Sequence, residues 1–223
     1  MNIIEYADRD MLAIDVANIL AGELKTCLLN HDTVSFAVPG GTTPGPIFDI
    51  LCAADLDWAR VHVFLTDERW VPESHARSNT GLVRSRLLVD RAASAVLVPL
   101  YAPADAPEDV LSTLTARFDD ELPIAVAVLG MGNDMHTASL FPGGDNLAAA
   151  LDHHAPVLLP MRIDGQPEVR ITLTAPVLSG ALSKHLVIFG TEKRAALDKA
   201  MGLPPEDAPI NAVLDGATVH WAE

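Results

Sequence analysis

The sequence predicts a single α/β domain, residues 1–223, in which a mostly parallel β-sheet carries helices on both faces. The length is one that a single α/β core commonly reaches. Apolar residues make up 49% of the chain and charged residues 20%, which excludes a disordered or fibrous protein. Short apolar runs alternate with amphipathic segments, and this alternation is typical of parallel strands joined by crossover helices.

The first half of the chain opens with a helix and then alternates strands with helices. Residues 11–29 place apolar side chains at helical spacing. Residues 33–38 form a short apolar run that ends at Pro39, Gly40 and Gly41, which predicts a buried strand followed by a turn. The next predicted segments are a helix over 46–51, a strand over 61–65, a helix over 81–88, a strand over 95–100, a helix over 108–122 and a strand over 124–129.

The second half continues the pattern with shorter segments. The sequence predicts a strand over residues 157–160, an amphipathic stretch over 171–182, the clearest late strand over 186–189, a helix over 193–201 and a short strand around Val219. The proline and carboxylate cluster over 203–209 predicts an exposed loop.

Charge and composition exclude several kinds of partner. The formal net charge of −15 repels nucleic acid and anionic membrane surfaces, so we expect neither as a partner. Residues 1–5 lack a basic segment followed by an apolar run, and no apolar stretch is long enough to cross a bilayer. Cys27 and Cys52 have no metal-ligand spacing and fit core thiols in a reducing compartment. We therefore expect a cytoplasmic protein.

Four segments carry chemistry, and the first is the loop at residues 39–44, Pro-Gly-Gly-Thr-Thr-Pro. Gly40 and Gly41 allow backbone amides to approach an anion, and the hydroxyls of Thr42 and Thr43 add donors. The amino terminus of the following helix favours negative charge, so the loop favours phosphate. An ordinary glycine turn with Thr43 as helix cap is the other interpretation.

The second segment, residues 66–72, places three charged residues directly after an apolar strand. Such charges are costly unless they are paired or stand at a functional site. One interpretation is a salt-bridged loop. In the other, Arg69 grips phosphate as a planar fork of donors while a neighbouring carboxylate orients it, and we expect Asp67 and Arg69 to contact the substrate.

The third segment, residues 129–144, is the most informative. A glycine-punctuated turn presents Asp134 and His136 two residues apart. A carboxylate beside a histidine fixes its tautomer and raises its basicity, which predicts a general base. The alternative is a structural histidine whose hydrogen bonds are satisfied.

The fourth segment is a basic pair that is distant in sequence. Arg170 begins Arg-Ile-Thr, and Lys193 follows a predicted strand at the start of a helix. A cation gains nothing from the helix dipole at that end, which favours another role for Lys193. Either residue alone is also explained as a solvated surface charge.

Together these segments resemble the 6-phosphogluconolactonase family, part of a wider group that includes glucosamine-6-phosphate deaminases. The resemblance implies a Rossmann-like fold and hydrolysis of a phosphorylated sugar lactone, with no metal or organic cofactor. It implies that His136 is the base that activates water and that Asp134 is its partner. It also implies that Arg69, Arg170 and Lys193 contact phosphate or carboxylate. The oligomeric state stays open.

The chain departs from the family pattern at two places. Met135 stands between the aspartate and the histidine where the family usually has glycine. If the backbone there is left-handed, a side chain costs about 1–2 kcal/mol, which favours a differently shaped loop. Pro39 and Thr42 stand where serines are common, which removes one hydroxyl but keeps the backbone donors.

Other functions are weighed on the same residues. The deaminase relatives have a carboxylate that assists ring opening where this chain has Phe141, and a tyrosine where it has Arg69, so the resemblance favours hydrolysis. A sugar-phosphate sensor without turnover is the non-enzymatic alternative if Met135 displaces His136. A serine hydrolase lacks its G-x-S-x-G turn here. A nicotinamide dehydrogenase lacks the third glycine of its motif, because Met135 stands there.

Overall fold

The main sheet of the protein has seven strands, all parallel, in the order β1-β10-β9-β6-β2-β3-β5. This arrangement comes from a computed structural model that describes all 223 residues. The strands are β1 (Asn2–Glu5), β2 (Val34–Val38), β3 (Val61–Leu65), β5 (Val96–Leu97), β6 (Val126–Leu129), β9 (Ser183–Phe189) and β10 (Thr218–Ala222). The predicted mostly parallel sheet is therefore confirmed.

A second, smaller sheet was not predicted from the sequence. Its antiparallel strands β4 (Asp67–Arg69), β8 (Arg170–Leu173) and β7 (Leu158–Met161) lie in the order β4-β8-β7. The register pairs Arg69 with Arg170 and Asp67 with Thr172. Two of the predicted chemical segments are thus neighbouring strands, although about a hundred residues separate them.

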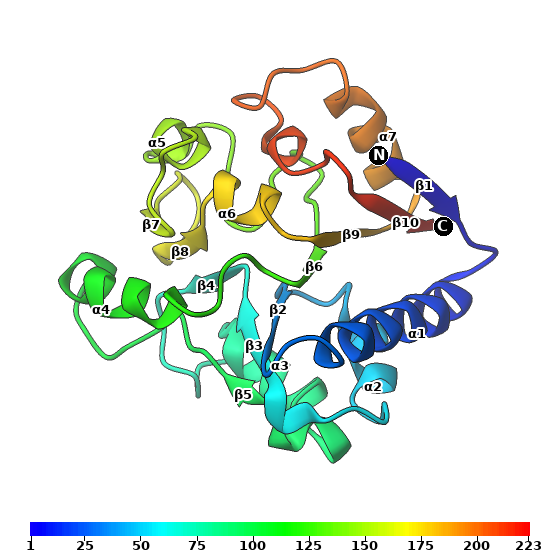
Figure 1. Cartoon of the computed structure of the whole chain (residues 1–223). Helices are drawn as coiled ribbons and strands as arrows, with labels where there is room; N and C mark the ends of the chain where they lie inside the picture. The colour runs from blue at the N-terminus through cyan, green and yellow to red at the C-terminus, as the bar shows by residue number, and fades with distance from the viewer.

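Helices cover both faces of the main sheet, as predicted. Helix α1 packs on β2, β6 and β10, and α7 packs on β9. Figure 1 shows α1 and α2 together on one side of this sheet and α7 on the other. The α-helices are α1 (Arg9–Leu28), α2 (Gly45–Leu51), α3 (Asn79–Arg86), α4 (Leu111–Thr115), α5 (Leu147–Leu151), α6 (Ala175–Ser179) and α7 (Thr191–Ala200). The 3-10 helices are η1 (Trp58–Arg60), η2 (Asp90–Ser94), η3 (Pro107–Val110), η4 (Ala116–Phe118) and η5 (Pro209–Ala212).

Helix α1 is favoured both by a capping residue at its amino terminus and by an apolar stripe along one face. Asp8 caps the amino terminus by accepting a hydrogen bond from the Met11 amide at 2.7 Å. Apolar residues at intervals of four and three then form one buried face against the sheet. Strands β2 and β6 are buried along their whole length because helices cover both of their faces. No helix is long and apolar enough to cross a membrane.

Several predicted segments differ from the structure. The expected helix over residues 108–122 is three short pieces, η3, α4 and η4. The amphipathic stretch over 171–182 divides into β8 and α6. Strands β1 and β4 and helix α5 were not predicted, and β9 begins three residues earlier than expected. Of the two cysteines assigned to the core, Cys52 is buried but Cys27 is only half-buried at its edge.

The sheet order identifies where a ligand binds. The chain passes from β2 to its neighbour β3, and from β6 to its other neighbour β9, so the direction of winding reverses between β2 and β6. In open α/β sheets, ligands occupy the crevice beyond the carboxyl ends of the strands at such a point. The four segments singled out in the sequence lie at or beside this end of the sheet.

Candidate active site

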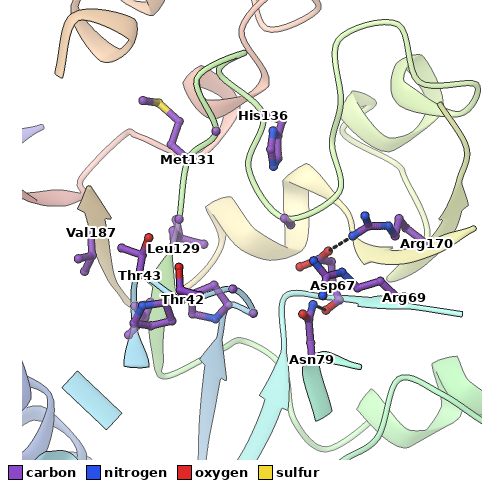
Figure 2. A pocket seen from close by; sticks show the side chains of 18 of the residues that line it. Thr42, Thr43, Asp67, Arg69, Asn79, Leu129, Met131, His136, Arg170 and Val187 are labelled. Carbon is purple, nitrogen blue, oxygen red and sulfur yellow. Dashed lines mark hydrogen bonds and ion pairs between the residues drawn. The ribbon is translucent and has the colours of Figure 1, made fainter. Parts of the chain in front are cut away.

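A cavity of about 400 Å³ lies at the carboxyl ends of β2, β3, β6 and β9. Figure 2 shows Thr42 and Thr43 on one side of it, Arg69 and Arg170 on the other, and His136 above and between them. Nine of the ten predicted site residues line the cavity: Gly40, Gly41, Thr42, Thr43, Asp67, Arg69, His136, Arg170 and Lys193. The tenth, Asp134, stands behind His136.

His136 and Asp134 form the hydrogen-bonded pair that the sequence predicts. The imidazole Nδ1 lies 2.5 Å from Asp134 Oδ1. This hydrogen bond from His136 holds the pKa of Asp134 below its usual value, although partial burial acts the other way. An ionised carboxylate only accepts hydrogen bonds, so Nδ1 carries the proton. Nε2 of His136 makes no hydrogen bond within the protein and is free to act as a base.

Met135 adopts the left-handed backbone conformation, with φ of 67°. Its amide donates to the Gly132 carbonyl at 3.0 Å, and its carbonyl accepts from the Ile210 amide at 3.1 Å. The side chain is 8% exposed and belongs to the hydrophobic core. These contacts outweigh a strain of about 1–2 kcal/mol. Met135 therefore occupies the position that favours glycine without separating His136 from Asp134.

The conformation and packing of the glycine loop require glycine at both Gly40 and Gly41. Gly41 has φ of 80°, and a Cβ atom on Gly40 would lie 2.1 Å from the side chain of Asn79. The cap position of α2 is Pro44, which makes no side-chain capping bond. The alternative in which Thr43 caps this helix is therefore wrong. The hydroxyls of Thr42 and Thr43 make no hydrogen bond within the protein.

The two carboxylates of β4 have different tasks. Glu68 is fully buried, and its oxygens accept hydrogen bonds from the backbone amides of Arg69, Asn79 and Thr80 at 2.7–2.8 Å. It also accepts from the Ser78 hydroxyl. Glu68 thus anchors the start of α3 to β4. Asp67 instead lines the cavity, where its carboxylate accepts a hydrogen bond from Ser139 Oγ at 2.6 Å and faces Arg170 at 3.9 Å.

Three arginines concentrate positive charge at the small-sheet side of the cavity. Arg170 is 6% exposed, and burial together with the charges of Arg69 and Arg77 lowers its pKa, while Asp67 opposes that shift. The Nε atoms of Arg69 and Arg170 are buried without hydrogen-bond partners. A bound anion would supply the missing acceptors and relieve the repulsion among the guanidinium groups.

Lys193 contributes a cation from another part of the fold. It lies in the first turn of α7, after Gly190, whose φ of 86° turns the chain out of β9. The side chain is half-buried, makes no ion pair, and has a pKa that burial lowers. The cavity therefore receives cations both from the end of β9 and from the small sheet, in a chain whose net charge is −15.

Four polar or aromatic residues that line the cavity were not among the predicted site residues: Arg77, Asn79, Phe141 and Gln166. Asn79 lies shortly after the charged segment at residues 66–72, and Phe141 was considered only as a difference from the deaminases. Arg77 and Gln166 lie on exposed loops, and nothing in their spacing indicates a site. The side chain of Gln166 is held at the cavity by a hydrogen bond of 2.8 Å, which its Oε1 accepts from Arg170.

Comparisons with known proteins identify the family of this chain. Residues 7–221 match the family model described as glucosamine-6-phosphate isomerases/6-phosphogluconolactonase. A 6-phosphogluconolactonase of Pseudomonas aeruginosa is 41% identical over 91% of this chain and 87% of that protein. One from Mesorhizobium japonicum is 40% identical over 97% of this chain and 93% of that protein.

Solved structures show the same fold. The crystal structure of a 6-phosphogluconolactonase from Shewanella baltica superposes with a TM-score of 0.96 at 29% identity, covering 100% of this chain and 98% of that one. A monomeric glucosamine-6-phosphate deaminase shares the fold alone, with a TM-score of 0.81 at 17% identity over 100% of this chain and 98% of that one. The chain therefore belongs to the family of glucosamine-6-phosphate isomerases and 6-phosphogluconolactonases.

Proposed function

We propose that this protein hydrolyses 6-phosphoglucono-δ-lactone to 6-phosphogluconate. The observation that carries the proposal is the free Nε2 of His136, which faces a cationic cavity while Asp134 holds Nδ1. The names of the relatives from Pseudomonas aeruginosa and Mesorhizobium japonicum support the same reaction.

The reaction proceeds by direct attack of water on the lactone carbonyl. His136 Nε2 removes a proton from water as the new C–O bond forms, and the Asp134 carboxylate stabilises the imidazolium. The negative charge on the carbonyl oxygen is stabilised by cationic side chains and backbone amides of the cavity. When the tetrahedral intermediate collapses, the ring C–O bond breaks and the imidazolium returns its proton to the departing ring oxygen.

The cavity has two anion-binding sides, and the substrate has polar groups at two ends. The amides and hydroxyls of the glycine loop lie on one side, and Arg69 and Arg170 lie on the other, with His136 between them (Figure 2). A phosphate at one end of the sugar and a lactone carbonyl near the other match this arrangement. Anchoring the phosphate orients the carbonyl for attack, a contribution that lowers the barrier by proximity.

Phe141 supports hydrolysis over isomerisation with deamination. Its ring lines the cavity next to His136, with the two ring centroids 4.5 Å apart. Ring opening and isomerisation of an amino sugar need a second group that transfers protons, and a phenyl ring has no proton to transfer. One base at this position is enough to activate water.

The test is to measure acid release from freshly prepared 6-phosphoglucono-δ-lactone above the spontaneous rate. We expect catalysis by the native chain, a loss of about a hundredfold or more in His136→Ala and a smaller loss in Asp134→Asn. His153→Ala, which changes an exposed histidine outside the cavity, is the matched control and should keep full activity. A native chain that binds 6-phosphogluconate but gives only the spontaneous rate would replace the enzyme by a sugar-phosphate sensor.

A further inference from the structure

Phe141 contacts both the proposed base, His136, and Arg170 of the small sheet. It is 4% exposed, and its ring packs against His136 with an angle of 44° between the ring planes. On the other side of the site, the guanidinium carbon of Arg170 lies 5.9 Å from the centroid of the same ring. Phe141 is therefore the side chain through which the small sheet touches the base.

The imidazole of His136 needs such a contact because its hydrogen bonds do not fix it. Its ring is held at Nδ1 by Asp134, and Nε2 must stay free for water. This bond restrains rotation about Cβ–Cγ only as far as Asp134 itself is fixed, and the Asp134 side chain is 54% exposed, so the two side chains can move together. To remove a proton from a water molecule about 3 Å away, Nε2 must point at that water, which requires a fixed ring plane. Packing around the ring has to supply the remaining restraint.

Gly132 supplies one boundary for the ring. A Cβ atom at this position would lie 2.3 Å from Cε1 and Nδ1 of His136 and 2.4 Å from Asp134 Oδ1. The Gly132 amide also donates to the His136 carbonyl at 3.0 Å. The ring is thus packed against bare backbone, and Phe141 supplies a second boundary.

Phe141 is itself held firmly enough to act as a boundary. The turn before it closes with a hydrogen bond of 2.9 Å from the Leu140 amide to the Thr137 carbonyl. Ser139, fully buried, donates its amide to Thr172 at 3.1 Å and its hydroxyl to Asp67 at 2.6 Å. Both acceptors belong to strands of the small sheet. The position of Phe141 therefore follows that of β4 and β8.

We propose that Phe141 is a positioning residue that, with Gly132, fixes the plane of the His136 imidazole so that Nε2 points into the cavity. The proposal rests on the proposed function, in which His136 is the general base. It assigns Phe141 no proton transfer and no covalent step. The small sheet then has two tasks: it carries the anion-binding arginines, and it aligns the base.

The test compares Phe141→Leu with Phe141→Tyr in the full-length protein. We expect Phe141→Leu to lower kcat about tenfold or more while KM changes less than about threefold. The orientation of the His136 ring is lost, whereas the groups that bind the substrate are unchanged. Phe141→Tyr keeps an aromatic ring and should recover most of kcat. Phe118→Leu is the matched control, because Phe118 is an equally buried phenylalanine outside the cavity that packs edge-on against Phe64. It should leave kcat unchanged.

A double-mutant cycle separates positioning from general destabilisation. If Phe141 acts through His136, Phe141→Leu should cost much less in an Asp134→Ala background, where the ring has already lost the acceptor for its Nδ1 proton. Equal fold losses in both backgrounds, or a rise in KM at unchanged kcat, would overturn the proposal.

A second readout does not depend on turnover. The proton on His136 Nδ1, shared with Asp134, should give a downfield NMR resonance that persists in Phe141→Tyr and broadens or disappears in Phe141→Leu. A resonance unchanged in Phe141→Leu would reject the positioning role even in a chain that shows no lactonase activity. If the proposed function is wrong but the positioning role is right, the native protein gives only the spontaneous rate, while the resonance still persists in Phe141→Tyr and is lost in Phe141→Leu.

Discussion

Met135 shows two opposing effects at a single residue. The left-handed backbone costs about 1–2 kcal/mol for a residue with a side chain. Burial of that side chain, which is 8% exposed, returns about 1.5–3 kcal/mol. The second effect is the larger, which explains how a methionine persists where glycine would be relaxed.

We predict that Met135→Gly lowers the free energy of unfolding by about 1 kcal/mol, because the lost burial exceeds the relieved strain. Lactonase activity should stay within about twofold, since the Asp134–His136 pair does not use the Met135 side chain. Urea unfolding measures the first quantity and initial rates the second. A more stable Met135→Gly protein would mean that backbone strain dominates at this position.

At the scale of elements, the start of α3 depends on one carboxylate. The fully buried Glu68 accepts hydrogen bonds from two amides of α3, from the Arg69 amide and from a hydroxyl. The negative charge also lies at the positive end of the helix dipole. This arrangement fixes Asn79 against Gly40 and thereby joins β4 to the glycine loop.

We predict that Glu68→Gln destabilises the protein by about 2–3 kcal/mol, because an amide group cannot replace both acceptor oxygens and places a donor against a donor. The midpoint of denaturant unfolding, at unchanged slope, is the measurement. Glu73→Gln is the control, since Glu73 pairs with Arg84 at the surface with side chains 46% and 50% exposed. It should cost less than about 1 kcal/mol. Equal losses in the two variants would contradict the anchoring role of Glu68.

Helix α1 is tied to the sheet by a chain of polar side chains. Tyr6 lies 2.9 Å from both Asp15 and His220, His220 lies 3.0 Å from His185, and His185 lies 2.9 Å from Glu23. Tyr6 must donate to the Asp15 carboxylate, so it accepts from His220 Nδ1. His220 Nε2 is then an acceptor for His185, and His220 is neutral.

This series of hydrogen bonds predicts that the stability of the protein depends on pH. Burial, and then the charge of His185, lower the pKa of His220 from 6.5 to about 4. The unfolded chain therefore takes up a proton near pH 6.5 that the folded chain resists until about pH 4. Folded stability should fall by on the order of 3 kcal/mol as pH drops through this window. Unfolding free energies measured at several pH values should show a shallower fall in His220→Gln, and an identical slope would count against this role of His220.

The elements that the sequence predicts best are those covered on both sides. Strands β2, β3 and β6 are predominantly apolar, with Ser35 and His62 as the polar exceptions, because helices cover both faces of the sheet. Strand β1 lies at an edge and is partly exposed, so its pattern carries little signal. Strand β4 consists of two carboxylates and an arginine, and it exists because it pairs with β8, which no local pattern reveals.

At the scale of the whole molecule, the candidate site lies between the two sheets. The backbone loops come from the carboxyl ends of the main sheet, and the arginines come from the small one. The charges of Arg69 and Arg77 disfavour the charge on Arg170, while Asp67 and Glu168 act the other way. An anion bound there links both sheets and should stabilise the folded state.

We predict that 6-phosphogluconate raises the temperature of thermal unfolding. A ligand that binds only the folded state adds about 2.7 kcal/mol at a concentration one hundred times its Kd. Arg170→Met should abolish most of this shift at the same ligand concentration. Arg91→Met, which removes an exposed arginine outside the cavity, should keep it. A shift of equal size in Arg170→Met would show that the anion binds elsewhere.

The candidate site was more predictable than the small sheet that completes it. Gly40, Gly41, Asp134 and His136 stand in loops directly after apolar strands, and the topology of parallel sheets brings such loops together. Arg77 and Gln166 reach the cavity because β8 pairs with β4 and carries their loops toward it. That pairing is a tertiary event between distant segments, so local sequence patterns do not contain it.

The position of β10 has a consequence for how the protein is made. Strand β10 lies between β9 and β1, and Asn2 pairs with Thr218. On the ribosome, β1 emerges first and must wait with an unpaired edge until β10 has been synthesised and inserted. Pairing over so long a stretch of chain is slow, and open strand edges invite association with other chains. We therefore expect a longer wait in this unfinished state to increase the need for chaperones, even though the finished sheet has β1 fully paired with β10.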